Sequence, residues 1–279
     1  MSVITLNRKR LALELKHITN EKIRDRQRQD GHIDIEGYYK DKIDTALKND
    51  RWKQTPIFVI CRDRISPLLE LIEWLESAGM NNIILVDNDS QYPDLLDYYA
   101  KTPYQVIYTG KNIGHTVVWA ESIARTLYDG EFYIVTDPDV IPDKSAPKDS
   151  VKYFFSIHRK YLQYKKVGFG LQIDDLPEHY SLRDSVVQWE SQFWKNELKD
   201  GLFEAGIDTT FALYKPFTDF YTLHPSIRTG RPYTAMHLPW YIDSSELDTE
   251  EAFYRMHARQ DVTSWNVEEI LDRYKKELG

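Results

Sequence analysis

Four short strand-like runs, separated by helical segments, constrain the fold of this chain more than any other feature of its sequence. The runs cover residues 57–60, 83–86, 105–108 and 132–135. Apolar runs of this length are typical of strands that are buried on both faces of a parallel sheet. Strands that alternate with helices predict βαβ units, and therefore an α/β fold with a mixed, mostly parallel sheet flanked by helices.

The other elements are predicted from apolar spacing and from residues that begin or end helices. Ser66 and Pro67 begin a predicted helix that Gly79 ends. Further helices are predicted over residues 115–128, 151–164 and 185–198, strands over 167–173 and 209–214, and a loop over 228–243. We expect one large domain over residues 55–265, a helical extension over 1–54 and an amphipathic terminal helix over 266–279.

Composition excludes some classes of partner and favours one compartment. The formal net charge is -8 and the charged residues are spread along the chain, which disfavours nucleic-acid binding. No apolar run is long enough to cross a membrane, and residues 1–16 lack the apolar region of a signal peptide. The single cysteine, Cys61, cannot form an internal disulfide. These features together predict a cytoplasmic protein without a transmembrane segment.

Polar residues follow the predicted strands at the point where each strand ends. They are Arg62, Asp63 and Arg64 after the first strand, Asp87, Asn88 and Asp89 after the second, Lys111 and Asn112 after the third, and Asp137 and Asp139 after the fourth. Ligands bind at the carboxyl ends of the strands in sheets of this kind. We therefore expect these side chains to meet at one edge of the sheet and to form a binding site.

The order of these turns resembles that of GT-A glycosyltransferases, over residues 55–143 in particular. Asp137-Pro138-Asp139 resembles the DxD motif of that fold. The turn at Asp87 is similar to the acid-rich turn of family 2 enzymes, although their Asp-Asp-Gly-Ser form is absent here. Gly110 to Gly114 is similar to the Asn-x-Gly turn that precedes the DxD strand. The resemblance implies a Rossmann-like GT-A fold with a nucleotide-sugar half over residues 55–143 and an acceptor half over 144–265.

The DxD resemblance implies a divalent cation, Mn²⁺ or Mg²⁺, because these ions prefer oxygen ligands and neutralise a departing diphosphate. Asp139 is the expected metal ligand, with Asp137 on the metal or on the ribose. His237 has counterparts in several GT-A families and would complete the metal site. The alternative is a loop histidine that packs against Trp240.

The expected donor-binding residues are Arg62, Asp87, Lys111, Asn112, Asp137, Asp174 and Arg231. Arg231 would bind the diphosphate through its guanidinium, and the alternative is that it lies on the surface in contact with solvent. Two acids are candidates for the catalytic base of an inverting reaction, Asp208 first and Glu190 second. Asp208 follows a Gly-containing turn and precedes a predicted strand, which would support a positioned side chain. In a retaining enzyme Asp208 would contact the donor sugar instead.

These observations predict a metal-dependent glycosyltransferase that moves a sugar from a nucleoside diphosphate sugar, most simply a UDP-sugar, to a glycan or glycolipid. A sugar-1-phosphate nucleotidyltransferase is the first alternative, but it would carry a glycine-rich loop after the first strand, where this chain has residues 61–67 without glycine. A non-catalytic nucleotide- or carbohydrate-binding module is the second. An intact acidic pair at residues 137 and 139 argues against a module without activity.

Overall fold

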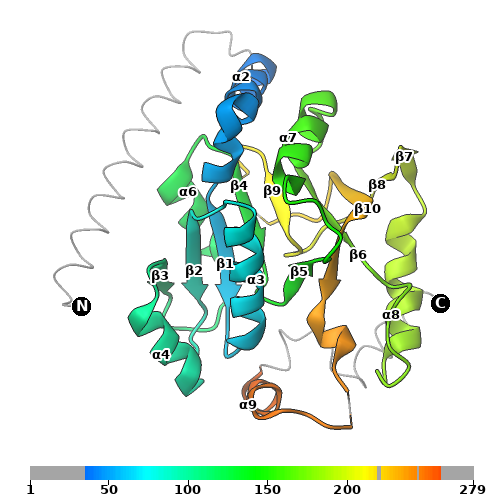
Figure 1. Cartoon of the computed structure of the whole chain (residues 1–279). Helices are drawn as coiled ribbons and strands as arrows, with labels where there is room; N and C mark the ends of the chain where they lie inside the picture. Colours follow the sequence, from blue (N-terminus) through cyan, green and yellow to red (C-terminus); the bar gives the residue numbers. More distant parts are fainter. Residues whose placement is uncertain (1–34, 219–220, 244, 259–279) are drawn as a thin grey trace, which may run out of the picture.

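The computed structural model describes residues 35–218, 221–243 and 245–258, and these residues form one ten-stranded sheet with helices on both faces (Figure 1). The strands are β1 (Ile57–Cys61), β2 (Ile83–Asp87), β3 (Gln105–Tyr108), β4 (Tyr133–Thr136), β5 (Val140–Pro142), β6 (Lys166–Leu171), β7 (Glu197–Lys199), β8 (Leu202–Glu204), β9 (Ala212–Tyr214) and β10 (Ser226–His237). Their order is β3-β2-β1-β4-β9-β6-β10-β8-β7, and β5 pairs with β10.

Strands β3, β2, β1 and β4 are parallel, as the four sequence runs predict. Strand β9 is antiparallel to both β4 and β6, β10 is parallel to β6, and β8 and β7 follow in antiparallel order. The predicted α/β class, with a mixed and mostly parallel sheet flanked by helices, is therefore confirmed. The carboxyl ends of β1, β2 and β4 share one edge of the sheet.

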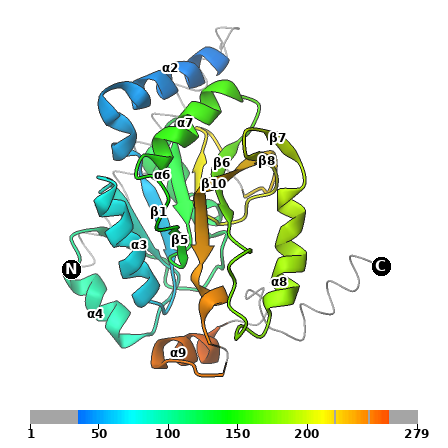
Figure 2. The ribbon, with the colours of Figure 1, turned by 45° about the vertical axis from the view of Figure 1, so that its right-hand side comes forward.

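The helices are α2 (Ile35–Leu47), α3 (Ser66–Ser77), α4 (Pro93–Lys101), α5 (Val117–Ala120), α6 (Ile123–Tyr128), α7 (Ser150–Lys160), α8 (Arg183–Glu190) and α9 (Thr249–His257). Short 3-10 helices cover Lys48–Gln54, Ser191–Trp194 and Leu238–Tyr241. Helices α3 and α7 lie in front of the strands in two views, and α9 lies at the opposite end of the molecule from α2 (Figures 1 and 2). None of the described helices is long and apolar enough to cross a membrane.

Strand β1 shows why the apolar runs are continuous. Ile57 and Val59 belong to the larger core, which packs under α2, α3 and α7. Phe58 and Ile60 point to the other face and pack with residues of α5 and α6. Successive side chains of a strand point to opposite faces, so a strand covered on both sides needs apolar residues at every position.

Several predicted bounds are wrong. The helix predicted over residues 115–128 is broken into α5 and α6, because Ser122 adopts a left-handed conformation with φ of 53°. The helices predicted over 151–164 and 185–198 end earlier, at Lys160 and Glu190. The strand predicted over 209–214 begins only at Ala212. Residues 1–34 and 259–279, which include the predicted terminal helix and most of the predicted extension, lie outside the described residues.

The loop predicted over residues 228–243 is the clearest error, because residues up to His237 belong to the twelve-residue strand β10. The glycine and proline that suggested a loop lie at an irregularity, where the pairing of β10 with β6 shifts between Thr229 and Thr234. An irregularity of this kind accommodates Gly and Pro without ending the strand. Strand β10 therefore continues to the pocket edge and carries His237 there.

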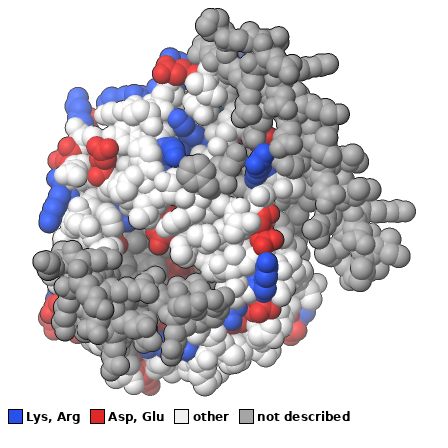
Figure 3. All heavy atoms as spheres, turned by 180° about the vertical axis from the view of Figure 1, so that it is seen from behind, with Lys and Arg blue, Asp and Glu red and all other residues white. Residues whose placement is uncertain are grey.

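Charged side chains are interspersed by sign on the described part of the face seen from behind (Figure 3). Lysine and arginine do not gather there into a patch of the kind that binds a nucleic-acid backbone.

We predict that His158 makes the fold sensitive to acid. Its side chain is fully buried, Nε2 lies 3.1 Å from the carbonyl oxygen of Leu213, and burial lowers the pKa of His158 to about 3. Below about pH 6.5 the unfolded chain binds a proton at this histidine that the folded chain does not, so the free energy of unfolding falls with decreasing pH by at most about 1.4 kcal/mol per unit. This fall in the free energy of unfolding takes place between about pH 6.5 and about pH 3.

Urea unfolding measured across this range should show a shallower pH dependence for His158→Phe than for the parent protein. Phenylalanine suits the site because the ring of Phe132 already packs there, 5.5 Å from the imidazole. Identical pH dependence in parent and variant would contradict the prediction.

Candidate functional site

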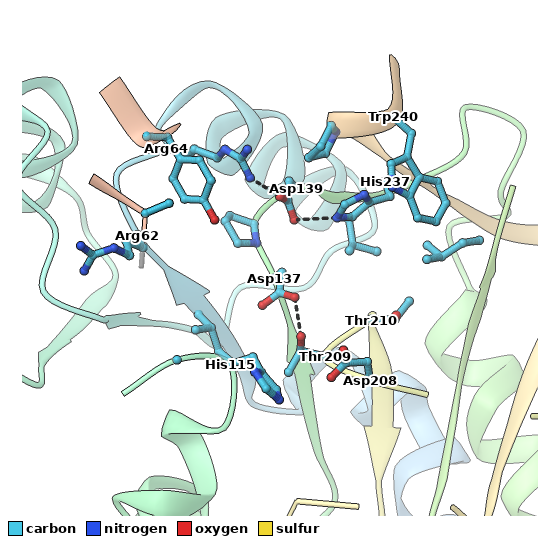
Figure 4. Close-up of a pocket in the computed structure, with 18 of the residues that line it drawn as sticks. Arg62, Arg64, His115, Asp137, Asp139, Asp208, Thr209, Thr210, His237 and Trp240 are labelled. Carbon is cyan, nitrogen blue, oxygen red and sulfur yellow. Dashed lines mark hydrogen bonds and ion pairs between the residues drawn. The ribbon is translucent and has the colours of Figure 1, made fainter. Parts of the chain in front are cut away.

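A pocket of about 750 Å³ opens at the carboxyl ends of β1 and β4 (Figure 4). Its walls come from the turn after β1, the turn between β4 and β5, the segment before β9, the end of β10, and helices α8 and α9. Elements from both halves of the described chain therefore meet around one cavity.

Asp137 is tied to the segment that precedes β9. Its backbone N–H donates to the carbonyl oxygen of Thr209 at 3.0 Å, and the Thr209 hydroxyl donates to its carboxylate. Burial, with the neighbouring charge of Asp139, raises the pKa of Asp137 well above its usual value. These bonds place Asp137 at the centre of the pocket, next to Asp208, Thr209 and Thr210 (Figure 4).

Asp139 lies between the guanidinium of Arg64 and the imidazole of His237. Its Oδ2 accepts a hydrogen bond from Nη1 of Arg64 at 2.6 Å, and its Oδ1 lies 3.9 Å from Nε2 of His237. Among the described residues, no group donates a hydrogen bond to this buried Oδ1. Burial lowers the pKa of His237, which favours the neutral imidazole. The His237 ring also packs on Trp240 with centroids 4.7 Å apart, as the alternative to a metal ligand predicts.

This geometry fits a divalent cation held by Asp139 and His237. The carboxylate oxygen without a partner faces a neutral imidazole nitrogen, and both are ligand types for Mn²⁺. The described residues contain no group of three or more acids, histidines or cysteines close enough to hold a metal by themselves. A cation there would complete its ligands from water and substrate phosphates, as Mg²⁺ commonly does.

Arg64, which is missing from the donor-binding residues predicted from sequence, connects the acidic turn to α9. Its Nη1 donates to Asp139, and its Nε and Nη2 donate to Oε2 of Glu251 at 3.1 and 2.7 Å. The guanidinium also lies over the ring of Tyr254, 3.6 Å from its centroid. Glu251 could not be found from local sequence, because its contact depends on how a distant helix docks.

Helix α9 is anchored across the pocket by a second acid. The Glu250 carboxylate accepts hydrogen bonds from the backbone N–H groups of Ile65 and Ser66 and from the Ser66 hydroxyl. These N–H groups belong to the first turn of α3, whose donors have no partner inside the helix. Glu250 therefore caps α3, and Glu251 beside it pairs with Arg64 in the turn that precedes α3.

The two candidate bases lie in different surroundings. Asp208 is exposed and lines the pocket, and its Oδ1 accepts a hydrogen bond from the Tyr221 phenol at 2.5 Å. Glu190 is buried and forms an ion pair with Nη1 of Arg228 at 2.7 Å. Burial raises the pKa of Glu190, while Arg228 opposes the shift. Asp208 is thus accessible to a substrate, and the carboxylate of Glu190 is already occupied.

Two predicted donor-binding residues besides Asp137 line the pocket, Arg62 and Asn112. The guanidinium of Arg62 points away from the two aspartates (Figure 4). Its Nη1 donates to the carbonyl oxygens of Asn88 and Asp89, and its Nη2 to that of His257. Arg62 therefore fastens the turn after β2 to the end of α9.

The other predicted donor-binding residues do not line the pocket. They are Asp87, Lys111, Asp174 and Arg231. The buried Asp87 carboxylate accepts a hydrogen bond from the Tyr99 phenol at 3.2 Å and faces the turn that follows β2. Exposed Lys111 pairs with Glu121 at 3.2 Å.

Asp174 and Arg231 form an ion pair of 2.7 Å at the surface, so they satisfy each other rather than facing a ligand in the pocket. Trp189 and Phe193 also line the pocket, although their helical spacing alone favours core positions over an acceptor platform.

Comparison with known proteins finds no matching family model and no matching curated protein. Among solved structures, a crystal structure of HddC from Yersinia pseudotuberculosis has a TM-score of 0.35 at 14% identity, covering 61% of this chain and 83% of its own. A UDP-glucose pyrophosphorylase in complex with UDP-glucose has a TM-score of 0.41 at 10% identity, covering 73% and 100%. Similarities of this size support no conclusion about activity.

We predict that Glu251 contributes to stability through Arg64. Glu251→Ala removes one partner of a nearly buried guanidinium and should lower the free energy of unfolding by about 3 kcal/mol. Glu131→Ala is the matched control, because it breaks an exposed lysine–glutamate pair and should cost less than about 1 kcal/mol. Urea unfolding of both variants measures the difference, and equal effects would show that the Arg64 pair does not stabilise the docked helix.

Proposed function

We propose that this chain is a metal-dependent glycosyltransferase that moves a sugar from a nucleoside diphosphate sugar, most simply a UDP-sugar, to a hydroxyl group of a glycan or glycolipid. One observation carries the proposal. The pocket contains two parts that the reaction uses. One is the acidic turn with Asp139, which faces the neutral imidazole of His237, and the other is the exposed carboxylate of Asp208 from the second half of the chain. The reaction needs both parts, because charge develops on the leaving group while the acceptor loses a proton.

On the donor side, Asp139 and His237 would hold the cation and Asp137 would contact the ion or the ribose. When bound, Mn²⁺ or Mg²⁺ supplies Lewis-acid stabilisation of the departing diphosphate. Electrostatic stabilisation of this kind is strongest in a pocket that excludes water. Arg64 lies at the same wall, where Asp139 and Glu251 balance its charge.

On the acceptor side, an inverting reaction assigns Asp208 the role of base. Its carboxylate takes the proton of the acceptor hydroxyl while that oxygen bonds to the anomeric carbon. The bond between this carbon and the diphosphate oxygen breaks, and the diphosphate leaves with the electron pair. The Tyr221 hydroxyl donates a hydrogen bond to Oδ1 of Asp208, so Oδ2 is the oxygen that takes the proton.

A sugar-1-phosphate nucleotidyltransferase fits the turn after β1 less well. Such an enzyme would use a glycine-rich loop there to hold phosphates, and residues 61–67 contain no glycine. The Glu250 carboxylate occupies the N–H groups at the start of α3, so they do not face a phosphate. One structural neighbour bears the name of a UDP-glucose pyrophosphorylase, and UDP release therefore needs to be distinguished from pyrophosphate release.

The test of the donor is a screen of nucleoside diphosphate sugars with Mn²⁺, scored for free UDP or GDP and, separately, for pyrophosphate with UTP and sugar phosphates. We expect UDP release that EDTA abolishes. Asp139→Asn should lower turnover by about 10²-fold or more, since it weakens both the metal site and the Arg64 pair. Asp149→Asn, an exposed acid before α7, is the matched control and should keep parental turnover. Full activity in EDTA would contradict the metal role, and pyrophosphate release would favour the nucleotidyltransferase.

The test of the base compares Asp208→Asn with Glu190→Gln. Asp208→Asn should reduce transfer by about 10² to 10⁴-fold and leave UDP binding unchanged, because a base acts only on the acceptor. Glu190→Gln should mainly lower the unfolding midpoint, because Arg228 then lacks its charged partner. Transfer by Asp208→Asn at near the parental rate would overturn the assignment.

A further inference from the structure

Lys166 is a lysine without access to solvent in the middle of the sheet. It belongs to β6, and its exposed fraction is 0%. Its Nζ donates to the backbone carbonyl oxygens of Ile207 and Thr222 and lies 3.4 Å from the Tyr214 hydroxyl. A buried ammonium is costly unless such acceptors surround it. Desolvation lowers the pKa of Lys166 to about 7, against an opposing effect of Asp208.

The two carbonyl groups belong to the two segments that carry the candidate base and its partner. Ile207 immediately precedes Asp208, and Thr222 immediately follows Tyr221. The Tyr221 phenol donates to Oδ1 of Asp208 at 2.5 Å. The contacts thus form a closed ring, which runs from Lys166 through one segment to Asp208, across to Tyr221, and back to Lys166.

The ring adds side-chain bonds to two segments that also share a backbone hydrogen bond, from the N–H of Ile207 to the carbonyl oxygen of Leu223 at 3.2 Å. Asp208 is exposed and lies in the irregular stretch between β8 and β9, and Tyr221 lies between β9 and β10. Strand β6 is fully buried and pairs with both β9 and β10. The amino group of Lys166 on this rigid strand can therefore hold both segments at once, because it donates to a carbonyl oxygen of each.

We propose that Lys166 is a positioning residue that, together with Tyr221, holds the Asp208 carboxylate in place for the reaction. The inference rests on the proposed function, in which Asp208 takes the acceptor proton. Lys166 lies beneath the pocket wall and touches no substrate. Its loss should therefore affect the transfer step and leave donor affinity unchanged, since small displacements of a reacting group lower rates steeply.

Lys166→Met tests the proposal because it removes the ammonium and keeps most of the side-chain length. We expect transfer to fall by about tenfold or more and UDP affinity to stay within about twofold of the parent. Hydrogen exchange should become faster in residues 206–209 and 221–224. Lys215→Met is the matched control, because Lys215 is also buried and bonds a carbonyl oxygen, but that oxygen belongs to Leu162 and lies in neither of the two segments. It should alter neither measurement.

Tyr221→Phe provides a second test that does not disturb the core. It removes only the hydroxyl that bonds Asp208, and transfer should fall by about tenfold with unchanged UDP affinity. Tyr104→Phe is its control, since the Tyr104 hydroxyl bonds an exposed acid, Glu76, outside the pocket. This variant should keep parental transfer.

The results separate failure of this inference from failure of the proposed function. If the parent protein releases no nucleoside diphosphate from any sugar donor, the proposed function fails, and the exchange measurement alone decides whether Lys166 ties the two segments. If the parent transfers sugar and Lys166→Met does so equally well, Lys166 does not position Asp208. Unchanged exchange in both segments would likewise overturn the inference.

Discussion

The burial of carboxylates around the pocket is the constraint on which this structure depends. Asp139, Glu190 and Glu251 are all nearly inaccessible to solvent, and an unpaired buried charge costs several kcal/mol. Each therefore requires a cation from another element, and Arg64 and Arg228 provide it. The site is held together by partners that are far apart in sequence.

The local part of this arrangement could be predicted from sequence and the distant part could not. Strands β1, β2 and β4 are buried at every position and apolar except at the last residues of β2 and β4, so their ends and the residues that follow are visible in the sequence. The contact between Arg64 and Glu251 joins residues 187 positions apart and leaves no local pattern. Strand β10 was missed for a related reason, because its irregular stretch has the composition of a loop while its pairing with β6 is long-range.

The contrast between Asp208 and Glu190 shows why residue type alone does not assign a base. Both acids line the same pocket, and both follow from sequence as candidates. Glu190 lies on α8 with its charge balanced by Arg228, whose guanidinium in turn packs 4.0 Å from the Phe193 ring centroid. The carboxylate of Asp208 accepts a hydrogen bond from the Tyr221 phenol and remains exposed. Burial and pairing, which depend on the fold, separate a structural carboxylate from one available to a substrate.

The balance of charge around the pocket supports the need for a cation in the proposed reaction. Among the described residues that line it, five are acids and four are arginines: Asp137, Asp139, Glu190, Asp208 and Glu251 against Arg62, Arg64, Arg228 and Arg255. The arginines at positions 64, 228 and 255 already pair with acids of the pocket, and Arg62 is bonded to backbone carbonyl groups. A diphosphate would therefore enter a pocket in which each of these arginines is already bonded to another group, and it would find no free positive charge among them. A divalent cation held by Asp139 and His237 would supply that charge at the leaving oxygen, while Glu251 keeps the guanidinium of Arg64 in place.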